Sequence, residues 1–211
     1  MKISIPFTHP IEADYTEARG TWGVILAHEP NTNDGILKAL AKKLREKDIA
    51  SIRFSITLPT GNRDNSKNFD NAFVEVWNYA QTNYSNLRWA IGGHSEGAVA
   101  AIRISTLVFT DEGSPPIISL GYPMYPPNKP EKVDTMALGA LIGDALFCQG
   151  TEDNRGTYNR LRNVIGMMAS HSKLGRIGGA NHEFEVGGKP LTTVAYWISN
   201  DINSFLRELS F

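Results

Sequence analysis

A serine flanked by two glycines is the part of this sequence best suited to chemistry. The segment Gly93-His94-Ser95-Glu96-Gly97 follows a short apolar run and precedes an alanine-rich stretch compatible with a helix. At a sharp strand-to-helix turn a serine presents its hydroxyl at the sheet edge, and glycines two positions away leave room for neighbouring backbone. The turn also directs the N–H of Glu96 and the positive end of the helix toward a developing negative charge. We therefore interpret Ser95 as a candidate nucleophile.

A serine hydroxyl needs a base to remove its proton and a third group to orient that base. Asp153 follows one apolar run and His182 follows the next, so the chain order is Ser95, Asp153, His182. We predict that these residues are nucleophile, acid and base, with Glu152 as the alternative acid. Asp144 precedes its predicted strand, so we expect it at the opposite end of the sheet.

The segments that must position these residues alternate between strand and helix. Apolar runs or alternating patterns predict strands at 3–7, 22–27, 52–56, 87–91, 117–120, 145–148 and 174–177. Apolar residues at helical spacing predict helices at 36–44, 69–80, 96–108, 158–168 and 190–209. Asp34 is the expected cap of the first helix, and 12–19 and 60–68 are read as polar stretches outside these elements. This alternation predicts an α/β fold with a doubly wound, mostly parallel sheet flanked by helices on both faces.

The composition is that of an ordinary globular protein, with 41% apolar and 20% charged residues among 211. No linker-like segment divides the chain, so we predict a single domain over 1–211, a monomer or small homo-oligomer. The 21 basic and 22 acidic residues form no block of one sign, which argues against nucleic-acid and membrane-surface partners. The absence of a signal-like or membrane-length apolar run predicts a cytoplasmic location. Cys148 is expected in the core, and no residue pattern suggests a metal site or a cofactor.

With these motifs in order, the chain resembles the α/β-hydrolase superfamily, in particular its small, capless, dienelactone-hydrolase-like branch. The segment 93–97 matches the nucleophile turn of that family, 149–153 matches its acid loop Q-G-x-x-D, and 179–184 matches its histidine loop G-A-x-H-x-F. The resemblance extends from Trp22 to Phe205 and implies a serine hydrolase acting through an acyl-enzyme. Because the connection 122–144 is too short for a substantial lid, we expect a small, soluble ester or thioester as substrate.

The chain departs from this family after its second predicted strand. Relatives usually carry His-Gly there, with backbone N–H groups that complete the oxyanion hole, whereas this chain has His28-Glu29-Pro30. We predict the N–H groups of Glu96 and Glu29 as the oxyanion donors. Pro30 has no N–H, and the Glu29 carboxylate would oppose an oxyanion unless it turns away or meets a cation such as Arg53. The departure supports an alternative function, a catalytically weak or inactive fold that serves as a binding or interaction module.

Four further residues near these motifs have open roles. His28 is predicted either as a substrate contact or as a brace of its own loop, and the brace is favoured. His94 is expected to pack beneath the serine turn. Met124 and Tyr125, in the proline-rich loop 121–127, are candidate substrate-binding residues at the floor of an acyl pocket, although a simple surface loop would have the same composition.

Overall fold

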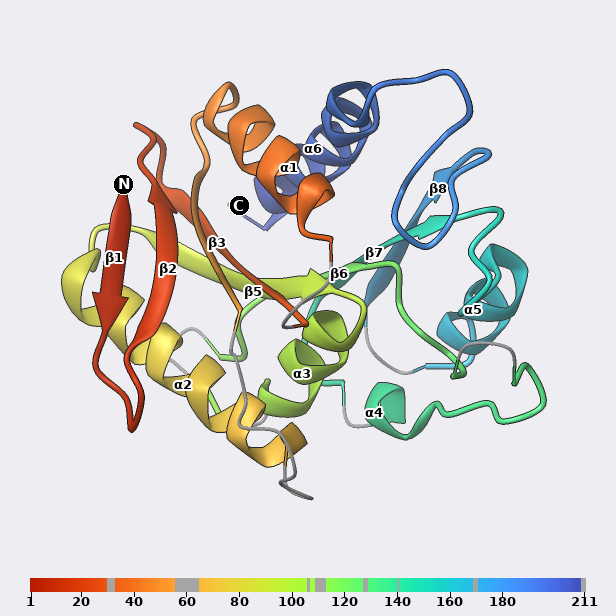
Figure 1. Cartoon of the computed structure of the whole chain (residues 1–211), viewed down its shortest axis with the longest axis horizontal. Coiled ribbons are helices and arrows are strands. Elements are labelled where there is room, and N and C mark those ends of the chain that lie inside the picture. Colours follow the sequence, from red (N-terminus) through yellow and green to blue (C-terminus); the bar gives the residue numbers. More distant parts are fainter. Residues whose placement is uncertain are drawn as a thin grey trace.

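Eight strands form one mixed sheet in the computed structural model, which describes residues 1–29, 33–55, 65–105, 107–108, 113–126, 129–139, 141–168 and 171–209. The strand order is β1-β2-β4-β3-β5-β6-β7-β8 (Figure 1). The strands are β1 (Lys2–Ile5), β2 (Ile11–Thr16), β3 (Trp22–His28), β4 (Ala50–Ser55), β5 (Arg88–His94), β6 (Ile117–Leu120), β7 (Ala145–Gly150) and β8 (Ser172–Ile177). The pairs β1–β2 and β2–β4 are antiparallel, and all pairs from β4 to β8 are parallel.

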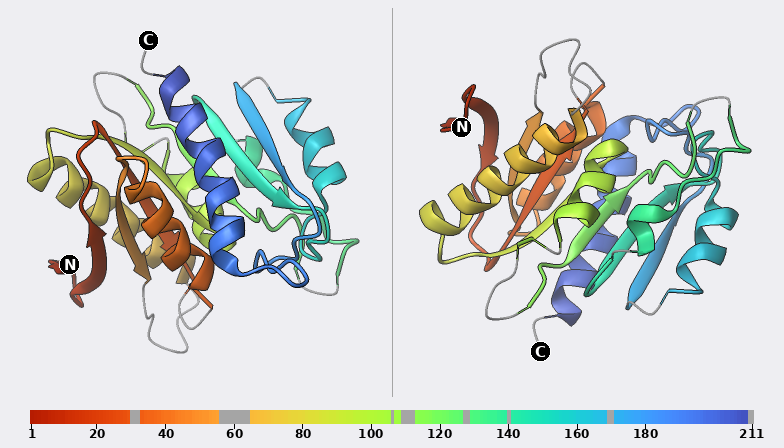
Figure 2. Two further views of the ribbon diagram at one scale, coloured as in Figure 1. Left: turned by 90° about the horizontal axis from the view of Figure 1, so that it is seen from above. Right: turned by 90° about the horizontal axis from the view of Figure 1, so that it is seen from below.

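Helices cover both faces of this sheet (Figure 2). They are α1 (Gly35–Arg45), α2 (Asn65–Asn83), α3 (Glu96–Ile104), α4 (Met136–Gly139), α5 (Tyr158–Ile165) and α6 (Leu191–Glu208). The apolar sides of α1 and α6 pack on one face, and those of α2, α3, α4 and α5 pack on the other. Burial from both sides explains the uninterrupted apolar composition of the central parallel strands.

The predicted fold class is confirmed, and each predicted strand and helix is present, most of them with shifted ends. The polar stretch 12–19 was misjudged, because β2 occupies much of it. In β2 the side chains of Ile11, Ala13 and Tyr15 are buried and alternate with more exposed polar ones, a pattern expected of an antiparallel strand with one solvent-facing side. The helix after Ser95 ends at Ile104, short of the predicted position 108.

Other sequence expectations near the strand ends need correction. Asp34 occupies the N-cap position of α1, but its side chain makes no capping hydrogen bond and pairs instead with Lys38 and Arg53. Residues 65–68, expected in a polar stretch, belong to α2. The predicted strand end Ile56, the rest of that stretch (60–64), Pro30 and Pro127 lie outside the described residues.

The connection between β6 and β7 contains, in its described part, only the one-turn helix α4. No lid-like domain is inserted there among the residues that the structure describes, which agrees with the sequence prediction. Tested for length and hydropathy, none of the described helices could cross a bilayer. Among the described residues, no large insertion covers the end of the sheet at which β5, β7 and β8 terminate.

Candidate active site

The turn that carries Ser95 is tight because it joins β5 directly to α3. Ser95 has φ 57° and ψ −123°, a left-handed conformation that non-glycine residues seldom adopt. A Cβ on Gly93 would lie 2.3 Å from the carbonyl oxygen of Ala27, and one on Gly97 would lie 2.1 Å from the same atom. The two glycines are therefore required by the close approach of β3, and the turn projects the serine hydroxyl beyond the sheet.

Three side chains that follow the parallel strands β5, β7 and β8 meet at this turn. His182 Nε2 lies 3.1 Å from Ser95 Oγ, and His182 Nδ1 lies 2.9 and 3.0 Å from the two carboxylate oxygens of Asp153. Because a carboxylate accepts from Nδ1–H, Nε2 carries the lone pair and can accept a hydrogen bond from the Ser95 hydroxyl. Asp153 is 1% exposed. Glu152 is exposed, so its neighbour Asp153 is the carboxylate that reaches the imidazole.

The carboxylate of Asp153 is itself held in place from two sides. Gln149 Nε2 donates to Asp153 Oδ2 at 2.9 Å, and the backbone N–H of Arg155 donates to Asp153 Oδ1 at 2.8 Å. The buried Gln149 side chain also accepts from the N–H of Tyr122 and donates to the carbonyl of Gly156. Sequence reasoning missed this role, although a glutamine within the otherwise apolar strand β7 was a usable signal.

His94 lies beneath the nucleophile turn, as predicted. Its Nε2 donates to the backbone carbonyl oxygen of His182 at 2.8 Å, and the two imidazole rings are 5.0 Å apart. Burial, and then the neighbouring His182, lower the pKa of His94 to about 4. The ring is therefore neutral near neutral pH, and its hydrogen bond supports the backbone of the histidine loop.

The two predicted oxyanion donors bring carboxylates with them. Glu96 is the first residue of α3, so its N–H has no acceptor within the helix. Glu29 follows β3 and is half-buried. Burial, followed by the charge of Glu96, raises the pKa of the Glu29 carboxyl, while the positive charge of Arg155 acts in the opposite direction.

Arg53, which the sequence suggested as a partner for Glu29, forms ion pairs with other carboxylates. Arg53 donates to Asp14 at 2.9 Å and to Asp34 at 3.0 Å, and the arginine whose charge acts on Glu29 is Arg155 instead of Arg53. His28 belongs to the same group: its Nδ1 lies 2.9 Å from the carbonyl oxygen of Glu29, and its Nε2 lies 3.9 Å from Asp34. Burial lowers the pKa of His28. These contacts favour the brace over the substrate contact.

Arg155 is a site residue that the sequence did not reveal. Its Nη1 donates to Ser95 Oγ at 2.9 Å, and its Nη2 lies 3.4 Å from a carboxylate oxygen of Glu96. The residue lies in the loop after β7, close behind Asp153, where an arginine has no distinguishing pattern. Only the folded loop shows that its guanidinium points at Ser95.

A small pocket lies beside the nucleophile turn. Its volume is about 190 Å³, and Glu96, Tyr122, Tyr125, Asp134 and Arg155 are among the residues that line it. The predicted binding residue Tyr125 is thus at the pocket wall. Met124, the other candidate from this loop, is fully buried and does not line this pocket.

Two larger hollows lie away from Ser95, so size does not identify the site. One, of about 740 Å³, lies between β2 and α1 and is lined by Tyr15 and Lys42. The other, of about 530 Å³, is lined by residues at the starts of strands, including Trp22 and Arg88. Among the described residues, no three His, Cys, Asp or Glu side chains are grouped to hold a metal ion. We assign no metal ligand.

Comparison with known families gives one match. A model of the α/β-hydrolase domain family matches residues 22–207, most of the chain. A search of curated proteins finds no match.

Solved structures show the same fold over nearly the whole chain. An α/β serine hydrolase homologue from Coxiella burnetii is 18% identical with a TM-score of 0.76, covering 96% of this chain and 97% of that one. A dienelactone hydrolase from Anabaena variabilis is 16% identical with a TM-score of 0.75, covering 97% of both chains. A serine hydrolase without a lid from Xanthomonas campestris is 16% identical with a TM-score of 0.71, covering 97% of this chain and 94% of that one. At these identities the likeness establishes the fold.

Proposed function

The chain belongs to the α/β-hydrolase domain family, and from this premise we propose that it is a serine hydrolase of small, soluble esters or thioesters. Ser95 is the proposed nucleophile, His182 the base and Asp153 the residue that orients the base. The observation that carries the proposal is the continuous chain of hydrogen bonds from Asp153 through His182 to Ser95 Oγ. That arrangement is what activation of a serine hydroxyl requires.

In the proposed reaction, Ser95 Oγ attacks the ester carbonyl carbon while its proton passes to His182 Nε2. The carbonyl electron pair moves to the oxygen, which the N–H groups of Glu96 and Glu29 are proposed to hold. His182 then gives the proton to the departing alcohol or thiol as the carbon–heteroatom bond breaks. Water then attacks the acyl carbon while giving a proton to His182. When the bond between Ser95 Oγ and the acyl carbon breaks, His182 returns this proton to Ser95 Oγ and the carboxylic acid product leaves. Asp153 keeps the imidazole in the tautomer that this sequence needs.

The size of the pocket beside Ser95 supports the proposed substrate class. A pocket of about 190 Å³ beside the nucleophile is smaller than the usual range for drug-sized ligands, roughly 300–1,000 Å³. It suits a short acyl group, with Tyr125 at its wall. The described part of the connection between β6 and β7 holds only α4 and offers no large surface to enclose a long lipid chain.

A second candidate function is a binding module with little or no turnover. The observation that favours it is the half-buried Glu29 carboxylate, whose pKa is raised by burial and by Glu96. An ionised carboxylate close to the oxyanion position would oppose the charge that forms there. The single domain over 1–211, the cytoplasmic location, the monomer or small homo-oligomer and the absence of nucleic-acid partners stay predictions from composition.

Labelling with a fluorophosphonate probe separates the two functions. We expect wild-type protein to be labelled at Ser95 and to hydrolyse p-nitrophenyl acetate. Ser95→Ala should abolish labelling and reduce turnover by roughly 10⁶-fold, as in other serine triads, with Tm nearly unchanged. The exposed Ser85→Ala is the matched control and should behave as wild type. Labelling of another residue would refute the assignment of the nucleophile, and no labelling at all would favour the binding module.

A further inference from the structure

Arg155 is the cation that directly contacts the proposed nucleophile. Its Nη1 donates to Ser95 Oγ at 2.9 Å, while the Ser95 hydroxyl donates to His182 Nε2 at 3.1 Å. The serine hydroxyl thus donates a hydrogen bond to the base, and its oxygen accepts a hydrogen bond from a permanent positive charge. A cation in that position stabilises the oxygen as it loses its proton, because the negative charge develops within hydrogen-bonding distance of the guanidinium.

The backbone of Arg155 is tied down on both sides. Its N–H donates to Asp153 Oδ1 at 2.8 Å, and its carbonyl oxygen accepts from the N–H groups of Met124 at 2.8 Å and Tyr125 at 3.1 Å. The residue is therefore linked to the acid of the triad and to the proline-rich loop at once. Its side chain is 17% exposed, so it starts from a fixed main chain and extends through a largely enclosed space. Preorganised charge of this kind needs no rearrangement during the reaction.

The positive charge of Arg155 acts on two carboxylates, those of Glu29 and Glu96. The proposed oxyanion donors are the N–H groups of Glu29 and Glu96, whose side chains carry carboxylates. Two negative charges beside an oxyanion would raise the barrier to forming a third. Arg155 Nη2 lies 3.4 Å from Glu96, and the charge of Arg155 also acts on Glu29. Its Nε is buried and has no hydrogen-bond partner among the described residues. The guanidinium therefore retains a donor beyond those used on Ser95 and Glu96.

From these contacts we infer that Arg155 is a catalytic residue: its guanidinium stabilises the negative charge on Ser95 Oγ and on the substrate oxyanion, and offsets the carboxylates of Glu29 and Glu96. The inference rests on the proposed hydrolase function. The covalent steps are unchanged, since the serine proton still passes to His182 and the carbonyl electron pair still moves to the substrate oxygen. Arg155 neither gives nor takes a proton.

The test compares Arg155→Gln with Arg155→Lys on p-nitrophenyl acetate. We expect Arg155→Gln to lower kcat by roughly 10²-fold, the lower end of the effect of one oxyanion donor, with KM within about twofold of wild type. Arg155→Lys retains the charge and should recover part of the loss. The backbone tethers of Arg155 do not need its side chain, so Tm should change little. Arg162→Gln, an exposed arginine on α5, is the matched control and should keep wild-type kinetics.

Other outcomes would overturn the inference about Arg155 or the proposed hydrolase function. If Arg155→Gln keeps or raises kcat while wild type turns over, the inference is overturned, because Arg155 is then dispensable or restrains the nucleophile. It is also overturned if the loss is confined to the KM of an anionic ester such as p-nitrophenyl hemisuccinate, which would make Arg155 a substrate-carboxylate contact. Arg155→Met serves if the glutamine variant fails to fold, with the same expected loss. If wild type neither turns over nor is labelled, the hydrolase proposal falls as well.

Discussion

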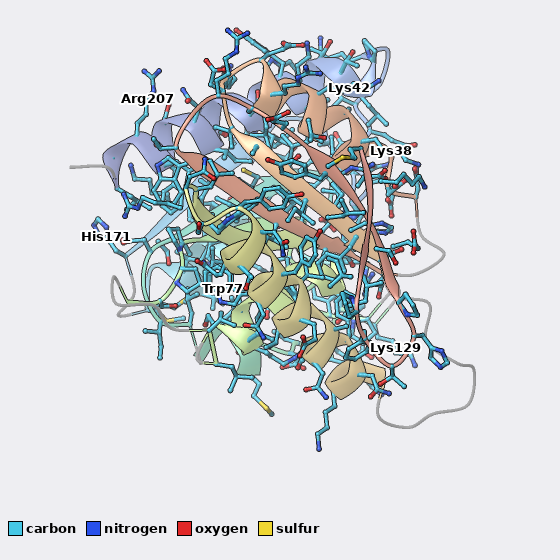
Figure 3. All side chains as sticks on the ribbon, turned by 90° about the vertical axis from the view of Figure 1, so that its left-hand side faces the viewer. Lys38, Lys42, Trp77, Lys129, His171 and Arg207 are labelled. Atoms are coloured by element: carbon cyan, nitrogen blue, oxygen red, sulfur yellow. The ribbon has the colours of Figure 1, made fainter. Side chains whose placement is uncertain are left out.

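Two histidine–aspartate pairs lie at opposite ends of the same two strands, β7 and β8. Asp153 and His182 follow these strands, are buried, and approach to 2.9 Å. Asp144 and His171 precede them and lie 3.3 Å apart, with the His171 side chain 89% exposed. Figure 3 shows His171 on the side of the molecule opposite Lys129, a residue of the β6–β7 connection.

The difference between these pairs lies in their surroundings, because the residue types are the same. The exposed pair is hydrated and screened, and such pairs contribute about 0–1 kcal/mol to stability. The buried pair has Ser95 on the far side of its imidazole and two further donors on its carboxylate. The carboxyl ends of parallel strands converge on one region, where loops can place a third group. An acid–base pair thus becomes a candidate site only at that end of the sheet.

The most direct test of this difference between the two pairs is to replace the aspartate by asparagine in each of them. Asp153→Asn should lower kcat by about 10⁴-fold, because the amide no longer selects the tautomer that leaves Nε2 free to accept a proton. Asp144→Asn should leave kcat unchanged and alter stability by no more than about 0.5 kcal/mol. Steady-state kinetics on p-nitrophenyl acetate and melting curves measure both. A larger loss from Glu152→Gln than from Asp153→Asn would show that the acid is misassigned.

The support behind the buried pair is tested by Gln149→Leu. This change removes the Gln149 hydrogen bonds to Asp153, Tyr122 and Gly156, and leaving buried backbone groups without partners costs about 1–3 kcal/mol each. We expect the free energy of unfolding to fall by about 2–5 kcal/mol. Because the Asp153 carboxylate would be displaced, kcat should also fall by about tenfold. Gln81→Leu, on α2 at the other end of the sheet, should change little. An unchanged kcat would mean that the N–H of Arg155 holds Asp153 without help.

The smallest expected effect is at Glu29, and it depends on pH. Because burial and Glu96 raise the pKa of Glu29 in the folded state, the ionised form destabilises the fold. Glu29→Gln should therefore raise Tm at neutral pH. The difference in Tm between Glu29→Gln and wild type should shrink as the pH falls through the raised pKa. It should vanish below the ordinary carboxyl range, where Glu29 is protonated in both the folded and the unfolded state.

The same variant should raise kcat/KM on p-nitrophenyl acetate by less than about tenfold, well below the 10²–10³ of a full oxyanion donor, since Arg155 already offsets the charge. Initial rates at neutral pH, measured beside the melting curves, check this. An equal or lower rate would show that the Glu29 carboxylate does not face the oxyanion.

Much of the fold was predictable because burial on both faces of a parallel sheet leaves a simple mark on the sequence. The runs that became β3, β5, β6 and β7 are apolar nearly throughout, and the helices show apolar residues at helical spacing. The strand β2 was missed because only alternate side chains of its short length are buried, so its composition is polar. A half-exposed antiparallel strand becomes evident only when its partner β4 is in place.

By itself, the sequence determined the order of the elements and the three residues predicted to act on an ester. Ser95, Asp153 and His182 each follow a strand closely, and parallel strands bring their carboxyl ends together whatever the loops do. Only the tertiary structure decided that Arg155 contacts Ser95 and that Gln149 holds Asp153. It also decided that Arg53 pairs with Asp14 and Asp34. These contacts join side chains from separate loops and strands. The contacts of Arg155 and Gln149 depend on how the loops fold over the sheet end, and the Arg53–Asp14 contact depends on the pairing of β4 with β2. No spacing along the chain records either of these.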